Sequence, residues 1–375
     1  MTEKRVPLYQ TIIDDIQSQI ASKAFQYEIP ICTEKSICDK YNTSRITAKH
    51  AINKLEERGI LYRKRGLGSF VVMPALKPVA HQVFALVIPF GTTLGGVFRS
   101  IDAANQIITR LGHQLTIHIS HANPKHNAVL LESLYSHNIN GIVYYPLNIS
   151  NLPVEILQKF AQDGRPVIIL DKKTTQPEIS TIHCDNFKGG YLLAEHLISY
   201  GHSNICYLSR FAPNELSSIN DRYMGYCSCL EAANITPRFV RWNAESPTGY
   251  YMLQHLVNAL RQDGVTAMVC ENDKVAFNVH MCCLGLGMRI PEDMSITGFD
   301  NIEWAVTGSA QITTIDQNFD IIGKTIAETL LDENYTPQNR TTPVQIIPRT
   351  STGVVAKNEP PPLSLQYALN AQNSY

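Results

Sequence analysis

A group of basic and hydroxyl side chains near the N-terminus has the types and spacing needed to bind DNA. Arg45, Thr47 and Lys49 follow Ser44 within the first turns of a predicted helix. Arg and Lys can reach guanine acceptors in the major groove, and Thr can contact a thymine methyl group or a phosphate. Candidates for further contacts to the DNA backbone or minor groove lie on either side, namely Lys35, Lys64, Arg65 and Gly66.

A helix-turn-helix followed by a hairpin would hold these side chains. Apolar residues at helical spacing predict two short amphipathic helices, and these residues are Ile37, Tyr41, Ile46, Ile52 and Leu55. Ser44 is a good N-cap for the second helix, predicted over 44–58, and Gly59 is a natural stop. Two strands, 60–62 and 69–72, flank a basic turn whose glycines permit close approach to DNA. With an amphipathic helix over 6–25 behind them, these elements outline a winged helix-turn-helix.

The charge distribution agrees with a small DNA-binding face. Residues 1–72 carry 12 Lys+Arg against 8 Asp+Glu, and the remainder carries 20 against 25. The formal net charge of −1 excludes a generally basic, histone-like protein. A solvated helix pair with a surface hairpin is the alternative interpretation. The order of the elements, rather than charge alone, favours DNA binding.

A second group of polar side chains follows predicted strands in the rest of the chain. Asp171, Asn272, Asp300 and Gln317 each come directly after an apolar strand, and Arg222 lies in a predicted helix. Carboxylates, amides and a guanidinium that converge on one cleft can bind a neutral polyol through hydrogen bonds, and Phe98 could stack on a sugar face. Each residue also has a plainer interpretation, because a polar residue after a strand is often a helix N-cap.

Short apolar strands alternate with helices throughout this region. The strands are predicted at 83–88, 114–119, 141–146, 166–170, 181–184, 204–209, 265–270 and 294–299. The helices are predicted at 97–110, 126–137, 151–163, 187–200, 217–233, 248–262, 273–286 and 319–333. This alternation predicts a doubly wound α/β core of two lobes with parallel sheets, and such sheets bind ligands at the carboxyl ends of their strands.

The 375 residues are expected to divide into a winged helix-turn-helix over 1–72, a linker over 73–82, a two-lobed core over 83–353 and a disordered tail over 354–375. The chain has no apolar run of membrane-spanning length, and we expect no N-terminal signal peptide. Its nine cysteines include no C-x-x-C pair, so we expect reduced thiols in a cytoplasmic protein, with no metal site and no cofactor.

Residues 4–72 resemble the DNA-binding head of the GntR family of bacterial regulators. The matching segments are PLYQTIIDDIQSQI, TEKSI, SRITAKHAINKLEERGILYR and RGLGSFV. The resemblance implies sequence-specific DNA binding by the residues named above. One departure is Tyr27-Glu28-Ile29-Pro30, where the family usually has Pro-Gly and a later Leu-Pro.

Residues 83–353 resemble the periplasmic-binding-protein-like core of LacI-family repressors (type I). The matching segments are DNFKGGYLLAEHLISYGH, RYMGY, CENDKVAF, LGMRIPEDMSITGFDN, ITTIDQ and PRTST. The resemblance implies that Asp171, Arg222, Asn272, Asp300 and Gln317 contact a sugar and that Phe98 stacks on it. The first loop, PFGTTLGGVF, departs from the family pattern, and a Pro-containing linker replaces the usual hinge helix.

Together the two resemblances imply a sugar-responsive repressor of a sugar-utilisation operon that binds operator DNA as a homodimer. The pairing resembles that of arabinose-responsive repressors, so a pentose, L-arabinose first, is the expected effector. A galactoside or another sugar is the alternative. An α/β enzyme is a second function class, but the sequence has no P-loop, G-x-G-x-x-G, G-x-S-x-G or H-E-x-x-H motif. A transport-linked sugar-binding protein is a third, and the DNA-binding head argues against it.

Overall fold

The computed structural model divides into two compact units, residues 1–79 and residues 80–375. We call them the head and the core, and each is described by itself. The structure describes residues 7–21, 30–64, 66–71, 81–89, 95–121, 123–243 and 248–355. Most of the predicted linker over 73–82 and of the predicted tail over 354–375 therefore lies outside the described residues.

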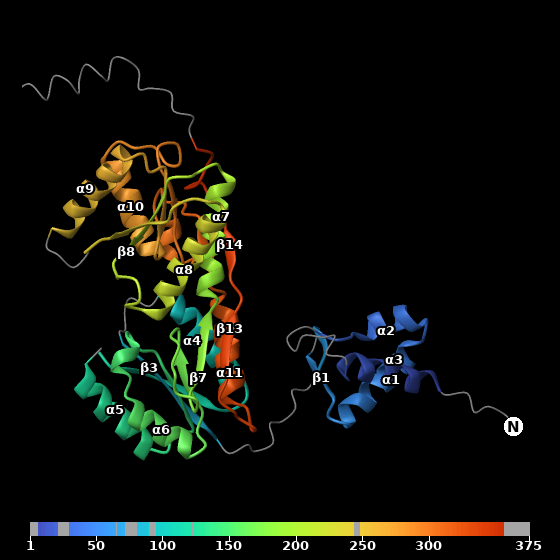
Figure 1. The fold of residues 1–375 in the computed structure, drawn as a ribbon. Helices are drawn as coiled ribbons and strands as arrows, with labels where there is room; N and C mark the ends of the chain where they lie inside the picture. Colours follow the sequence, from blue (N-terminus) through green and yellow to red (C-terminus); the bar gives the residue numbers. More distant parts are fainter. Residues whose placement is uncertain are drawn as a thin grey trace, which may run out of the picture. The chain divides into compact units, whose positions relative to one another are not determined.

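The head contains three helices and a hairpin among its described residues (Figure 1). They are α1 (Leu8–Ala21), α2 (Glu34–Tyr41), α3 (Arg45–Glu57), β1 (Leu61–Lys64) and β2 (Gly68–Val71). Thr33 and Ser36 form a capping box that begins α2, and Ser44 caps α3 by accepting a hydrogen bond from the Thr47 amide. Asn42 turns the chain between the two helices with a φ of 44°.

A small apolar core holds the head together. One face of α1 supplies three buried isoleucines, and α3 packs against that helix with a buried stripe of its own. The buried residues are Ile12, Ile13, Ile16, Ile37, Ala48, Ala51, Ile52, Leu55, Leu61 and Val71, together with Cys32. The prediction for Ile46 was wrong. Helical spacing placed it with the apolar residues of the helix face, but the structure leaves it 82% exposed.

The first lobe of the core, residues 83–184 and 319–342, contains a six-stranded parallel sheet ordered β13-β7-β6-β5-β3-β4. Its strands are β3 (Val83–Ile88), β4 (Gln114–Ile119), β5 (Gly141–Tyr144), β6 (Val167–Leu170), β7 (Ser180–Cys184) and β13 (Asn339–Thr342). Its helices are α4 (Gly96–Arg110), α5 (Pro124–Ser136), α6 (Val154–Gln162) and α11 (Phe319–Leu330).

The second lobe, residues 186–316 and 345–355, contains a four-stranded parallel sheet ordered β11-β10-β8-β9. Its strands are β8 (Ile205–Ser209), β9 (Arg238–Arg241), β10 (Ala267–Cys270) and β11 (Ser295–Thr297). Its helices are α7 (Asn186–Ser199), α8 (Ser217–Ala232), α9 (Gly249–Gln262) and α10 (Asp273–Gly285). An antiparallel pair, β12 (Thr314–Asp316) and β14 (Gln345–Ile347), lies beside this sheet.

Most strands of the two sheets are buried on both faces, so they are largely apolar at successive positions rather than at alternate ones. In β3, Phe84 and Leu86 face a cluster that is continuous through both lobes, whereas Ala85 and Val87 face α5 and α6. In β8, Tyr207 faces the shared cluster, and the neighbouring Leu208 lies in a cluster with α9 and α10. This pattern is typical of doubly wound parallel sheets, which confirms the predicted fold class.

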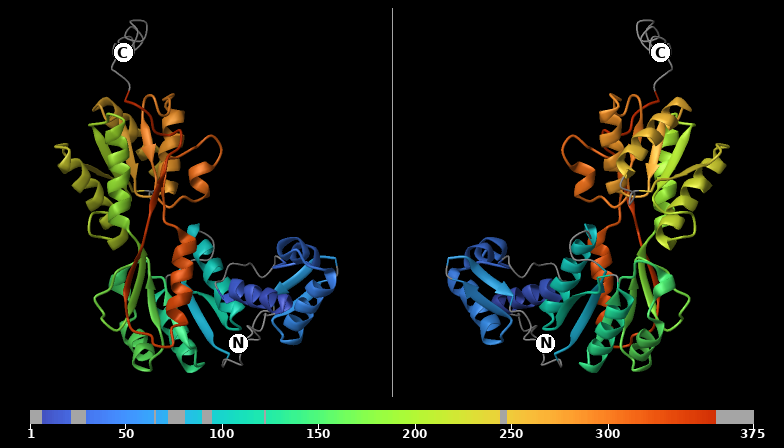
Figure 2. Two further views of the ribbon diagram at one scale, coloured as in Figure 1. Left: turned by 90° about the vertical axis from the view of Figure 1, so that its right-hand side faces the viewer. Right: turned by 90° about the vertical axis from the view of Figure 1, so that its left-hand side faces the viewer.

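The chain crosses between the lobes three times, after β7, after β12 and between β13 and β14. Figure 2 shows the last crossing, where the C-terminal segment (red) runs from one lobe to the other.

The helices α7 and α8 pack closely because two glycines lie at their contact. A Cβ on Gly190 would meet the Arg222 carbonyl oxygen at 1.9 Å, and a Cβ on Gly225 would meet the Phe187 carbonyl oxygen at 1.9 Å. Gly190 and Gly225 are thus packing positions.

Candidate functional site

A cavity of about 560 Å³ lies between the two lobes of the core. Its walls come from the segments that follow the carboxyl ends of strands in both sheets, where open α/β sheets bind ligands. Those segments contribute Pro89, Tyr145, Asp171, Arg210, Asn272 and Asp300. This volume is within the usual range for small-molecule sites, roughly 300–1,000 Å³. We call this cavity the cleft.

Arg222 of α8 is a buried cation at the base of the cleft. Its Nε donates to the Asn186 side-chain oxygen at 2.8 Å, and a terminal nitrogen donates to the Glu271 carbonyl oxygen at 2.7 Å. Its guanidinium also lies 3.7 Å from the centre of the Phe299 ring. Arg222 therefore joins α7, α8 and the end of β10, and it has a structural role beside any contact with a ligand.

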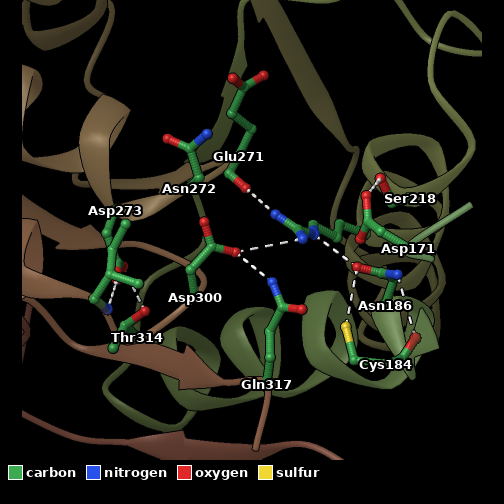
Figure 3. Close-up of polar contacts among 12 residues, drawn as sticks. Asp171, Cys184, Asn186, Ser218, Glu271, Asn272, Asp273, Asp300, Thr314 and Gln317 are labelled. Atoms are coloured by element: carbon green, nitrogen blue, oxygen red, sulfur yellow. Dashed lines mark hydrogen bonds and ion pairs between the residues drawn. The ribbon is translucent and has the colours of Figure 1, made fainter. Parts of the chain in front are cut away.

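Asp300 is the acceptor at the centre of the polar network in Figure 3. Its Oδ1 accepts a hydrogen bond from Gln317 Nε2 at 2.6 Å and lies 3.4 Å from a terminal nitrogen of Arg222. Burial raises the pKa of Asp300 to about 6, although Arg222 and Gln317 oppose the shift. Its φ of +114° lies in a region that residues other than glycine rarely adopt. Strained backbone of this kind is often found where a side chain is aimed at a ligand.

Asp171 lies on the other side of the cleft, after β6, and also has a positive φ, 68°. Its carboxylate bonds to Lys172 Nζ and accepts a hydrogen bond from Ser218 Oγ at 3.3 Å. Lys172 Nζ in turn donates to Ser218 Oγ at 2.8 Å. Because Ser218 lies in the first turn of α8 in the second lobe, these contacts connect the two lobes. Sequence reasoning missed Lys172, whose position directly after Asp171 at a strand end was the available signal.

Asn272 is an N-cap, as its plainer interpretation predicts, and its contact with a sugar stays a prediction. Its side-chain oxygen accepts a hydrogen bond from the Val275 amide at 2.9 Å, so it caps α10, and it also lines the cleft. The next residue, Asp273, is fully buried and accepts from Thr314 Oγ1 at 2.5 Å and from the Ile302 amide at 2.9 Å. Burial raises the pKa of Asp273 well above its ordinary value. Asp273 thus holds neighbouring segments together.

The structure does not bring Phe98 into the cleft. The buried face of α4 comprises Gly96, Ser100, Ile101, Ala104 and Ile108. Phe98 lies off this face, is 42% exposed and is not among the residues that line the cavity. Among the described residues, the Phe, Tyr and Trp side chains that do line it are Tyr145, Phe211, Trp304 and Phe319. Phe319 fits against Gly96, where a Cβ would meet its ring at 1.8 Å. The sequence reasoning missed Phe319, which could have been found because it follows the predicted site residue Gln317 by two positions.

In the head, the N-terminal turns of α3 expose the predicted DNA-contacting residues. The Arg45 side chain is 83% exposed and forms an ion pair with Glu34, its Nε lying 2.7 Å from a carboxylate oxygen. Lys49 is exposed one turn later, and Thr47 is half-buried beside the Ser44 cap. An ion pair this exposed is worth little, so Arg45 can exchange Glu34 for a base or phosphate at small cost.

The remaining predicted residues flank that helix. Lys35 is exposed on α2, and Gly66 has a φ of 78° in the turn between β1 and β2. Lys64 ends β1, with its ammonium 5.0 Å from the centre of the Phe70 ring. Arg65 lies outside the described residues. Arg63, predicted to be part of the turn, instead belongs to β1 and forms ion pairs with Glu34 and Glu56, at 3.7 and 2.8 Å.

Two kinds of site are absent from the described part of the chain. No helix there is long and apolar enough to cross a membrane. No cluster of three or more His, Cys, Asp or Glu side chains in those ranges could hold a metal ion.

Comparison with known proteins finds a matching family model within each unit. Residues 8–71 match the model of bacterial regulatory proteins of the gntR family, and residues 194–352 match that of periplasmic binding protein-like domains. The arabinose metabolism transcriptional repressor of Geobacillus stearothermophilus is 24% identical over 88% of this chain and 92% of its own length. The HTH-type transcriptional repressor PurR of Yersinia enterocolitica is 28% identical over 66% of this chain and 72% of its own length.

A solved structure agrees with the fold of the core. A LacI family transcriptional regulator from Enterococcus faecium, with bound ribose, aligns with a TM-score of 0.61 and 23% identity over 73% of this chain and all of its own. This likeness bears on the fold alone. The chain therefore combines a GntR-type DNA-binding domain with a periplasmic-binding-protein-like domain.

Proposed function

We propose that this protein is a sugar-responsive transcriptional repressor that binds operator DNA through its head and is released when a small sugar occupies the cleft. The observation that carries the proposal is the convergence of Asp171, Arg222, Asn272, Asp300 and Gln317 around one cavity in a chain that also has a DNA-binding domain. We further propose residues 1–72 as the DNA-binding domain, 73–82 as the linker and 83–353 as the effector domain.

The chemistry of the cleft suits a neutral polyol. The carboxylates of Asp171 and Asp300 accept hydrogen bonds from hydroxyl groups, while Arg222 and Gln317 donate to hydroxyl oxygens. Aromatic rings such as Phe319 supply a flat apolar surface for the C–H face of a sugar ring. A sugar has a hydroxyl group on nearly every carbon, so it requires a site with both hydrogen-bond acceptors and donors beside an apolar wall.

L-Arabinose is the effector we propose first. One relative along nearly the whole chain is named as a repressor of arabinose metabolism, and a regulator with a similar core contains bound ribose. Another pentose, a galactoside or a different sugar is the alternative. Relatives named as transcriptional repressors also favour a regulator over an α/β enzyme, and a DNA-binding function implies a cytoplasmic protein.

Closure of the two lobes is the proposed switch. The three crossings between the lobes form a hinge, and Asp171, Lys172 and Ser218 already link the lobes on one side of the cleft. A sugar that bonds to both lobes favours the closed form, and hinge closure can carry a local contact to a distant element. Through the linker and a dimer partner, closure would change the spacing of two heads on DNA.

A homodimer is the proposed assembly, and the core has a candidate surface for it. Several large apolar side chains on α9 and α10, which pack together, are exposed. They are Tyr250, Tyr251, Met252, Met281 and Leu284. An exposed apolar patch of this kind commonly marks an interface, and a C2 dimer matches an operator with two half-sites.

The proposal is tested by a thermal-shift screen of the full chain against L-arabinose, D-ribose, D-xylose, D-galactose and lactose. Operator duplexes recovered by selection from a random library are then titrated with the protein, with and without the sugar that stabilises it. We expect stabilisation by a pentose and weaker DNA binding in its presence. Selection that recovers no duplex, or DNA binding that no stabilising sugar alters, contradicts the proposal.

A further inference from the structure

Ile46 is an apolar side chain in an unexpected place. At 82% exposure it is the most exposed large hydrophobic residue in the described ranges. It is the second residue of α3, and the helix buries a separate stripe against the head core: Ala48, Ala51, Ile52 and Leu55. Packing within the head therefore does not account for an isoleucine at this position.

The position of Ile46 on the helix puts it among the proposed DNA contacts. Arg45 precedes it, and Lys49 and His50 follow at the three- and four-residue spacings that share a helix face. Side chains in a helix lean toward its N-terminus, so Ile46 extends toward the end that enters the major groove in helix-turn-helix proteins. Ser44 caps that end, which keeps the first turn ordered.

An isoleucine side chain can recognise one major-groove feature only. It has no hydrogen-bonding atoms, so it cannot bind the donors and acceptors of guanine, adenine or cytosine. The C5 methyl group of thymine is the apolar group displayed in the major groove. We propose that Ile46 determines specificity by packing on a thymine methyl group of the operator, beside the contacts of Arg45 and Lys49. This inference rests on the proposed DNA-binding function.

The size of the effect follows from the methyl group itself. Removing one buried methyl costs about 0.8 kcal/mol, which corresponds to roughly a fourfold loss of affinity. Exposure of Ile46 means that substituting it leaves the head core intact, and alanine favours a helix. Ile46→Val retains a branched apolar side chain and is the matched control.

The test uses the full-length protein and a duplex selected from a random library with the wild type. Each thymine is replaced in turn by deoxyuridine, which lacks only the methyl group, and affinity is measured by fluorescence anisotropy at fixed salt. We expect roughly fourfold weaker wild-type binding at one thymine, or at a symmetry-related pair. Ile46→Ala should bind the thymine and deoxyuridine duplexes equally, while Ile46→Val should still distinguish them.

Two outcomes overturn the inference. Either the wild type is indifferent to deoxyuridine at every position, or Ile46→Ala keeps the wild-type sensitivity. If the duplex is still bound and Arg45→Ala weakens that binding, the proposed function stands and only the role of Ile46 fails. If the wild type selects no duplex at all, the proposed function fails together with the inference.

Discussion

Asp300→Asn should separate sugar binding from DNA binding. The substitution keeps the shape of the side chain and removes the charge that accepts from Gln317 at 2.6 Å and faces Arg222 at 3.4 Å. Asp300 is a better position for this test than Arg222, because Arg222 also joins α7 to the end of β10. Asparagine also tolerates positive φ better than most residues.

The expected loss can be worked from the contacts. A hydrogen bond to a charged group is worth about 1.5–3 kcal/mol, so a sugar hydroxyl that loses the carboxylate should bind roughly 10- to 150-fold more weakly. Burial already disfavours the ionised carboxylate in the folded protein, as its pKa of about 6 indicates. Removing the charge should therefore leave the unliganded melting temperature within about 4 °C of the wild type.

Calorimetry with L-arabinose measures the sugar affinity, and anisotropy measures operator affinity in the same buffer. Asp320→Asn is the control, because that carboxylate also pairs with an arginine, Arg99, but its side chain is 72% exposed and does not line the cleft. We expect wild-type behaviour from the control, and normal operator binding without sugar release from Asp300→Asn. A folded Asp300→Asn protein that L-arabinose releases at the wild-type concentration would refute the proposed site.

Four further predictions follow from the same structure. Sugar affinity should be full above pH 6 and fall as pH drops through about 6, because the Asp300 carboxylate then takes up a proton. Calorimetry from pH 5 to 8 measures this dependence, and the same profile in Asp300→Asn would count against it. Arg45→Ala should cost ~1–3 kcal/mol of operator affinity and relax specificity at one base pair, whereas Lys54→Ala, later in α3, should change it little; equal affinities of the two variants contradict this docking. Gly225→Ala should destabilise the core by about 1–3 kcal/mol or more in chemical unfolding, because its Cβ has no room beside α7, and a wild-type midpoint would show that the helices separate easily. The full chain should sediment as a dimer at tens of micromolar, and Met281→Lys on α10 should weaken that dimer; a wild-type monomer excludes it.

The sign of the pH effect on stability is opposite to its effect on sugar binding. In the unfolded chain the Asp300 carboxyl has its ordinary pKa of 3.8, below the value of about 6 in the folded protein. Between these values the folded state retains a proton that the unfolded state has lost. This group therefore contributes stability at pH 4 that is lost as pH rises through 6, and Asp300→Asn should remove that dependence.

The alternation of strands and helices in the core was predictable because most of the parallel strands are apolar on both faces. All of the predicted core strands and helices occur, with shifts at their ends. The strands β9, β13 and β14 were missed. β9, with the sequence RFVR, and β13, with NRTT, lie at sheet edges, where pairing with one neighbour rather than apolar composition holds a strand in place. Such pairing depends on residues distant in sequence.

Side-chain direction limited what the sequence could say about the sites. Asp171, Asn272, Asp300 and Gln317 were accessible to reasoning because the carboxyl ends of parallel strands face the same cleft. Phe98 and Ile46 were not, because each lies on a helix whose rotational phase is set by packing. A shift of two positions along a helix turns a side chain by about 200°, and periodicity fixes that phase only where the apolar stripe is unambiguous.

Release of operator by sugar is the measurement that tests the central claim most directly. The full-length protein is bound to a selected, fluorescently labelled duplex, and L-arabinose is titrated into the complex at fixed salt. The account predicts release, with operator affinity reduced about 5- to 150-fold at saturation and sugar affinity reduced by the same factor when DNA is bound. Operator affinity that stays unchanged at saturating L-arabinose, and at saturation with each other sugar of the screen, would contradict it.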